Sequence, residues 1–121
     1  TDAQAQVRTL RSLGLEANFI TNASTADIRT AIDAGRPVPV GWLHHGPVSA
    51  PSGGGHYSVV MGYSDSAWIM NDPNGEASLV AGGYTKNMDG SNQSYSFKNW
   101  NPRWIVEGEG SGWMMDIRLP S

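Results

Sequence analysis

The chain has 121 residues, a net charge of −3 and no cysteine. This length fits one domain, and the lack of a basic run argues against nucleic acid as a partner. No apolar stretch approaches the length that spans a membrane, so no membrane partner is predicted either. Without cysteine, these residues supply no disulfide, no thiolate metal ligand and no cysteine nucleophile.

The first third of the chain predicts two helices separated by a short strand. Apolar residues at helical spacing indicate a helix over residues 2–13, and alternation indicates a strand over residues 15–20. Ser24, followed three residues later by Asp27, resembles a capping box. It therefore predicts the start of a second helix, which continues to about Ala34.

An extended segment and a long loop follow. Residues 36–42 alternate proline with valine, and the missing N–H groups of Pro37 and Pro39 favour a strand start or a sheet edge. Residues 43–55 are rich in Gly, Pro and Ser. A loop of this length inside a compact domain is often functional.

The central stretch, residues 56–72, predicts a β-hairpin with its turn at residues 64–65. This register brings His56 opposite Asp72 or its neighbour. Directly opposed residues share a face, with Cβ atoms about 4.5–5.5 Å apart, whereas a shift of one residue would separate them. Both faces of the hairpin are apolar, which places it in the middle of a sheet.

The last third is more polar and predicts short strands. Residues 84–96 are expected to be irregular, and residues 108–112 to link the last two strands as a hairpin. Helices followed by a mostly antiparallel sheet indicate an α+β fold, with two N-terminal helices packed on the sheet. The expected strands are 78–81, 97–100, 103–107 and 113–119.

His56 and Asp72 are the first candidates for chemistry. An imidazole beside a carboxylate is the arrangement of a general base and the acid that orients it. Gly54 and Gly55, directly before the histidine, allow close approach of a substrate backbone. The alternative is an ordinary hydrogen bond at a strand end, with Asp72 starting an Asp-Pro turn.

A metal site is the second interpretation of the histidines. His44, His45 and His56 with Asp72 are ligand types that zinc accepts. Nothing resembles an H-E-x-x-H motif, and adjacent loop histidines commonly face solvent or form hydrogen bonds. The sequence therefore predicts neither a metal nor a cofactor, although metal-dependent hydrolysis through His44, His56 and Asp72 remains an alternative.

The tryptophans could form a sugar-binding groove or a packed core. Core packing is favoured for most of them, but Trp42 and Trp100 adjoin loops and are expected to be the exposed members. The candidate substrate-binding residues are Trp42, His45, Gly54, Gly55 and Trp100.

Three motifs in order resemble the C39-like branch of the papain-like cysteine peptidases. They are Gly35-Arg36-Pro37-Val38-Pro39-Val40-Gly41-Trp42, then Gly55-His56-Tyr57-Ser58-Val59-Val60-Met61-Gly62-Tyr63, then Asn71-Asp72-Pro73. The similarity covers residues 25–76 well. Residues 98–104 look like versions attached to bacteriophage tail or lysis proteins.

This resemblance implies a papain-like fold with His56 as catalytic base and Asp72 as its orienting partner. The family's nucleophile is a cysteine at the start of an upstream helix, near a polar side chain of the oxyanion hole. No residue here can take that role. Because the chain begins with Thr1, we expect it to be the C-terminal part of a larger peptidase domain, inactive by itself and associating with its missing cysteine-bearing segment.

The resemblance also implies a substrate and a location. We expect cleavage of peptide bonds in bacterial peptidoglycan, by an extracellular or virion-associated protein. The alternative is a domain that has lost catalysis and serves as a binding or structural module of a phage tail or a cell-wall-associated protein.

Overall fold

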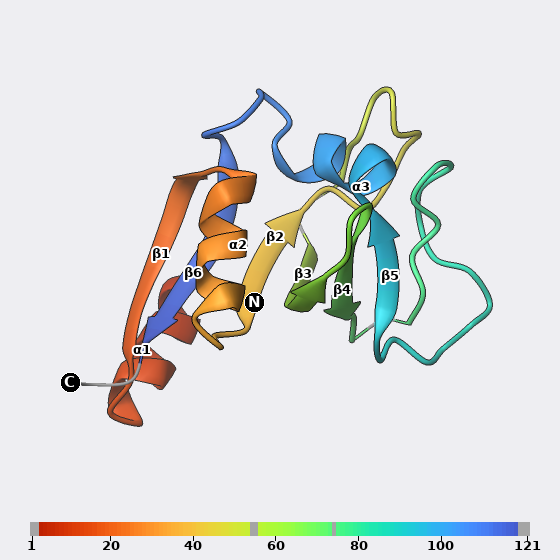
Figure 1. Ribbon diagram of the computed structural model, residues 1–121. Helices are drawn as coiled ribbons and strands as arrows, with labels where there is room; N and C mark the ends of the chain where they lie inside the picture. The colour runs from red at the N-terminus through yellow and green to blue at the C-terminus, as the bar shows by residue number, and fades with distance from the viewer. Residues whose placement is uncertain (1–2, 54–55, 74, 119–121) are drawn as a thin grey trace.

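The computed structural model describes residues 3–53, 56–73 and 75–118, and it shows a six-stranded sheet flanked by helices (Figure 1). The strand order is β1-β6-β2-β3-β4-β5, and each neighbouring pair is antiparallel. The prediction of an α+β fold with a mostly antiparallel sheet is confirmed. The elements are α1 (Ala3–Ser12), β1 (Glu16–Ala23), α2 (Thr25–Asp33), β2 (Val38–Trp42), β3 (His56–Tyr63), β4 (Ala67–Asn71), β5 (Gln93–Ser96), α3 (Phe97–Trp104) and β6 (Gly112–Arg118).

The two faces of the sheet are covered differently. On one face, alternate residues of β2, β3 and β4 join α2 and α3 in the main core, which includes Val40, Val60 and Trp100. On the other face, Leu10 of α1 packs on β1 and β6. Met61 of β3 is 47% exposed on this second face. β3 and β4 lie inside the sheet, as their two apolar faces predicted, although this face of the hairpin is only partly covered.

The N-terminal third forms the elements expected from its periodicity. The two predicted helices correspond to α1 and α2, which β1 separates and which lie against opposite faces of the sheet. At the start of α2, the Asp27 carboxylate accepts the Ser24 N–H at 2.8 Å, as in a capping box. Strand β1 continues to Ala23, three residues beyond the predicted end at Ile20.

Strand β2 lies inside the sheet, between β6 and β3, so of the two positions expected for the prolines the strand start is present and the sheet edge is not. Pro39 pairs with Val59 of β3. The pairing of β2 with β6 involves only Val40 and Gly41. The proline therefore precedes the part of β2 that is paired on both sides, where a missing N–H would cost a ladder hydrogen bond.

The hairpin of β3 and β4 differs from the predicted register. Its turn is shifted by one residue, because the Ser64 N–H donates to the Ala67 carbonyl. A bulge at Met61 then changes the register again, since Val60 faces Met70 while Gly62 faces Ile69. A bulge inserts one residue into one strand. Beyond it, the register places the position of residue 72 on the same face as residue 56.

The C-terminal third contains the largest departures from prediction. Residues 97–100 and 103–107, expected as strands, form α3 and the turn after it, and residues 108–111 form a loop that ends where β6 begins at Gly112. The Ser96 hydroxyl caps α3 by accepting the Asn99 N–H at 3.2 Å. Residues 78–81 form turns beside an isolated bridge from Ala77 to Tyr84. The last strand is present as β6.

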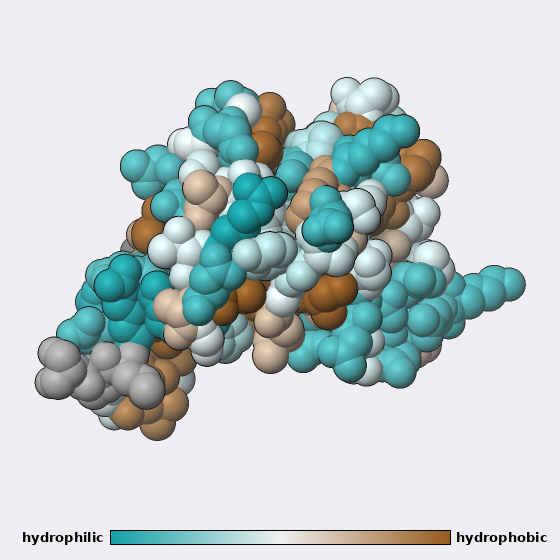
Figure 2. Space-filling model, in the orientation of Figure 1, coloured by the Kyte–Doolittle hydropathy of each residue, from teal (hydrophilic) through white to brown (hydrophobic). Residues whose placement is uncertain are grey.

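Part of the segment expected to be irregular, residues 84–96, is ordered into β5. The rest of the connection between β4 and β5 forms a hydrophilic lobe, at the right in Figures 1 and 2. Among the described residues, no helix is both long and apolar enough to cross a membrane.

Candidate active site

His56 and Asp72 meet at one edge of the sheet. His56 is the first residue of β3, and Asp72 follows the last residue of β4. The imidazole Nε2 lies 2.8 Å from Asp72 Oδ1. The imidazole is 10% exposed and the carboxylate fully buried. The predicted proximity of the two side chains is therefore present, although their backbones are not directly opposed.

The Asp72 carboxylate accepts further hydrogen bonds from two tyrosines. The Tyr84 hydroxyl lies 3.1 Å from both carboxylate oxygens, and the Tyr95 hydroxyl lies 2.8 Å from Oδ2. A buried carboxylate is tolerated only when its lone pairs are satisfied. These donors favour the ionised form of Asp72 and hold it in one orientation.

Tyr95 is itself fixed from a second side. Its hydroxyl accepts the Ala77 N–H at 3.0 Å. Burial, reinforced by the negative charge of Asp72, raises the pKa of Tyr95 well above its usual value. The hydroxyl thus remains a proton-bearing donor to Asp72 throughout the neutral pH range.

The imidazole of His56 packs against a braced indole. The rings of Trp42 and His56 meet edge to face, with centroids 5.6 Å apart. Trp42 Nε1 donates to Ser58 Oγ at 2.8 Å, and this hydroxyl in turn contacts Met70 Sδ at 3.4 Å. The hydrogen bond to Ser58 therefore fixes the indole of Trp42. The fixed indole packs against the imidazole of His56 and limits its rotation.

The pairing with Asp72 determines the tautomer of His56. An ionised carboxylate only accepts hydrogen bonds, so Nε2 carries the proton and Nδ1 has the lone pair. Among the described residues, none makes a hydrogen bond to Nδ1. This arrangement can accept a proton at Nδ1, and the resulting imidazolium is stabilised by Asp72.

His44 is a second imidazole beside this pair. Its ring centroid lies 5.1 Å from that of His56 and 3.9 Å from that of His45. Burial, followed by the neighbouring charges of His45 and His56, lowers the pKa of His44. Among the described residues, none forms a hydrogen bond with its buried Nδ1. His44 is therefore neutral at pH 7, where it adds no positive charge next to His56.

These histidines do not form a metal centre in the described part of the chain. No group of three or more His, Cys, Asp or Glu residues there has the geometry to hold a metal ion. The alternative of metal-dependent hydrolysis through His44, His56 and Asp72 therefore has no geometric support.

Arg103 anchors the loop that contains His44 and His45. Its side chain is fully buried, and all five guanidinium N–H groups are used by backbone carbonyls. Nε donates to Leu79 at 2.8 Å, and Nη1 donates to Leu43 and His45 at 3.3 and 3.0 Å. Nη2 donates to Gly46 at 2.7 Å and also to Leu79. One side chain thus ties the 43–46 segment to the turn at residue 79.

The structure also locates the other predicted site residues. Trp42 and Trp100 were expected to be exposed, which is wrong: they are 2% and 0% exposed. The reason is that α3 places Trp100 against Trp42, with ring centroids 6.0 Å apart. His45 is exposed, and Gly54 and Gly55 lie outside the described residues.

Sequence reasoning missed four residues of this site: Ser58, Tyr84, Tyr95 and Arg103. Ser58 could have been found, because it lies two residues after His56 and therefore on the same face. Tyr84, Tyr95 and Arg103 come from a loop, a strand and a helix further along the chain. No local pattern connects them to His56.

Comparison with protein families gives a match over most of the chain. A sequence model described as the Peptidase C39-like family matches residues 4–104, a range that includes His56 and Asp72. Searches among curated proteins and among solved structures found no match.

Proposed function

The chain belongs to the Peptidase C39-like family, and from this premise we propose that it provides the histidine and aspartate of a papain-like cysteine peptidase. His56 is the catalytic base and Asp72 the residue that orients it. The observation that carries the proposal is the 2.8 Å contact from Nε2 to a buried carboxylate. Since the 121 residues contain no cysteine, the nucleophile comes from a segment outside this sequence.

The proposed reaction uses Nδ1 of His56. This nitrogen takes the proton of the cysteine thiol, and the thiolate attacks the carbonyl carbon of an amide. The imidazolium then returns the proton to the leaving amine, and water hydrolyses the thioester that remains. Asp72 stays ionised throughout, because it accepts hydrogen bonds from both tyrosines as well as from His56.

We propose peptide bonds of bacterial peptidoglycan as the substrate, and an extracellular or virion-associated location. The support is the resemblance of residues 98–104 to domains attached to phage tail or lysis proteins. Residues 97–104 form α3, whose Trp100 packs against Trp42 of the site.

The test uses the full gene product that contains this chain. His56→Ala should abolish the release of new amino groups from purified peptidoglycan, whereas Asp33→Asn, an exposed carboxylate variant, should retain it. The rate of alkylation of the cysteine by iodoacetamide should be measured against pH. When His56 is present, the cysteine should react at pH values well below about 8.5, the ordinary pKa of a thiol, and in His56→Ala it should not. Undiminished cleavage by His56→Ala would overturn the mechanism.

A non-catalytic binding module is the second candidate, and the observation that favours it is the cysteine-free composition. It predicts a gene product without any nucleophilic cysteine. It also predicts binding to peptidoglycan that is the same for the native protein and His56→Ala. Loss of cleavage in His56→Ala would exclude this candidate.

A further inference from the structure

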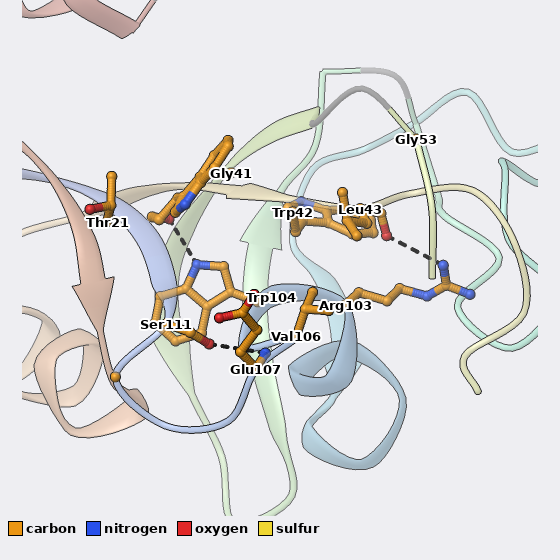
Figure 3. Close-up of a pocket in the computed structure, with 12 residues that line it drawn as sticks. Thr21, Gly41, Trp42, Leu43, Gly53, Arg103, Trp104, Val106, Glu107 and Ser111 are labelled. Atoms are coloured by element: carbon orange, nitrogen blue, oxygen red, sulfur yellow. Dashed lines mark hydrogen bonds between the residues drawn. The ribbon is translucent and has the colours of Figure 1, made fainter. Parts of the chain in front are cut away.

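A cavity of about 490 Å³ lies at the end of β2, next to Trp42. We call it the indole pocket. Figure 3 shows Trp104, Glu107 and Ser111 on one side of it, and Leu43 and Arg103 on another. Its walls are mostly apolar, and the residues that matter here are Trp42, Trp104, Trp113, Arg103, Glu107 and Ser111.

The indole pocket adjoins the His56–Asp72 pair. Trp42 is common to both, because it lines the pocket and its ring meets that of His56 at 5.6 Å. Gly53, which precedes β3 in the chain, also lines the pocket. A peptide chain bound at His56 therefore has a neighbouring cavity in which to place a side chain.

Most polar groups of the indole pocket already have partners. All five N–H groups of Arg103 are bonded to carbonyls. Trp104 Nε1 donates to the Trp113 carbonyl at 2.8 Å. The Ser111 hydroxyl donates to the Gly108 carbonyl at 2.5 Å and accepts the Glu107 N–H at 3.2 Å. These groups have no donor left for an anionic ligand.

The Glu107 carboxylate is different, since no described residue donates a hydrogen bond to it or forms an ion pair with it. Its backbone is nevertheless held in place by Ser111. The loop is anchored a second time through Glu109, whose carboxylate accepts the N–H and the hydroxyl of Thr25 at 2.8 and 2.5 Å. A fixed loop thus presents one unpaired negative charge beside aromatic walls.

We propose that the indole pocket binds an alkylammonium side chain of the substrate, such as that of a lysyl or another diamino-acid residue. The apolar stem contacts the indoles of Trp104 and Trp113, and the ammonium group pairs with Glu107. Indole faces attract cations as well as apolar surface. This inference rests on the proposed function for the identity of the ligand as a substrate residue, but binding itself requires no catalysis.

The experiment measures binding to the chain with two matched probes, Nα-acetyl-lysine amide and Nα-acetyl-norleucine amide. The indole N–H signals of the five tryptophans are followed by NMR. The lysine probe should shift the signals of Trp104 and Trp113. Those of Trp68 and Trp100, which do not line the pocket, should stay in place.

The variant that isolates the charge is Glu107→Gln. It should weaken binding of the lysine probe about threefold to tenfold, as expected for a partly exposed charge pair with aromatic neighbours, and leave the norleucine probe unaffected. Glu16→Gln, the same exchange at an exposed position at the far end of β1, should change neither. Equal affinity for both probes, or no effect of Glu107→Gln, would overturn the inference.

This outcome is separable from that of the proposed function. If His56→Ala abolishes cleavage but the probes show no preference, the pocket inference fails alone. If the full gene product lacks a cysteine but the lysine probe binds through Glu107, the pocket stands and the peptidase mechanism fails.

Discussion

Two carboxylates belong to the regions that share Trp42, namely the His56–Asp72 pair and the indole pocket, and they are held in opposite ways. Asp72 is fully buried and accepts hydrogen bonds from His56, Tyr84 and Tyr95. Glu107 is exposed, and no described residue pairs with its carboxylate. A carboxylate that orients another side chain is fixed by hydrogen bonds to its own oxygens. A carboxylate that recognises a ligand needs acceptor sites that no protein group occupies. The difference between the two regions can be tested by substitution.

The largest expected effect comes from Arg103, which supports both regions. Arg103→Met removes five hydrogen bonds to the carbonyls of Leu43, His45, Gly46 and Leu79. We expect the free energy of unfolding, measured in urea, to fall by about 3–5 kcal/mol. The control is Arg36→Met, which breaks a partly exposed pair with Asp116 and should cost at most about 1 kcal/mol. Equal losses would contradict the anchoring role.

Asp72→Asn tests the carboxylate that accepts hydrogen bonds from His56, Tyr84 and Tyr95. The amide brings two N–H groups to a site that already contains three donors, so at least one buried hydrogen bond is lost. We expect a loss of about 2–4 kcal/mol in unfolding free energy. Asp33→Asn is the matched control, because Asp33 accepts a single hydroxyl, that of Tyr63, at the surface. If the control were as costly as Asp72→Asn, burial would not be the cause.

Tyr95→Phe sharpens the comparison through pH. The raised pKa means that folded Tyr95 keeps its proton above pH 10, where the unfolded chain releases it. The contribution of Tyr95 to the free energy of unfolding is therefore fully present below pH 10 and is lost as the pH rises further. Tyr95→Phe should cost about 1–3 kcal/mol at pH 7, since the Ala77 N–H and Asp72 lose a partner. Its unfolding free energy should then decline less between pH 9 and 11 than that of the native chain. An equal decline in both proteins would place the titrating group elsewhere.

The smallest effect on the free energy of unfolding is expected at Glu107, whose carboxylate has no partner among the described residues. Glu107→Gln should change the unfolding free energy by no more than about 0.5 kcal/mol, as surface substitutions do. Two residues away, Glu109→Gln should cost about 1–2 kcal/mol, because Glu109 binds the first residue of α2. Urea unfolding of both variants checks the difference. A large loss in Glu107→Gln would show that this carboxylate has a structural partner.

The hairpin shows how far sequence reasoning reaches. The apolar residues of the hairpin and the turn expected at residues 64–65 are local signals, and they predicted β3, β4 and the meeting of His56 with Asp72. The same signals misplaced the register, because the turn is shifted by one residue and the bulge at Met61, next to Gly62, inserts an extra residue into β3. Register is set by packing across the whole sheet, which a single strand pair does not reveal.

Helix α3 shows where local propensity misleads. Its aromatic residues favour strands in isolation, and residues 97–100 were accordingly predicted as one. Yet Phe97, Trp100 and Trp104 follow helical spacing, and this spacing places one aromatic face against the core. Burial of that face outweighs the intrinsic preference of the individual residues. It also removes Trp100 from the surface, where it was expected to bind substrate.

By itself, the sequence determined the α+β class, the order of the three C39-like motifs, the pairing of His56 with Asp72 and the lack of a cysteine among these residues. Only the tertiary structure decided that Tyr84 and Tyr95 saturate Asp72, that Arg103 anchors the loop of His44, and that Glu107 remains open beside the indoles. The reason is range. Periodicity and turn residues act over a few positions, whereas hydrogen-bond partners of a buried charge are assembled from segments that meet only when the core is packed.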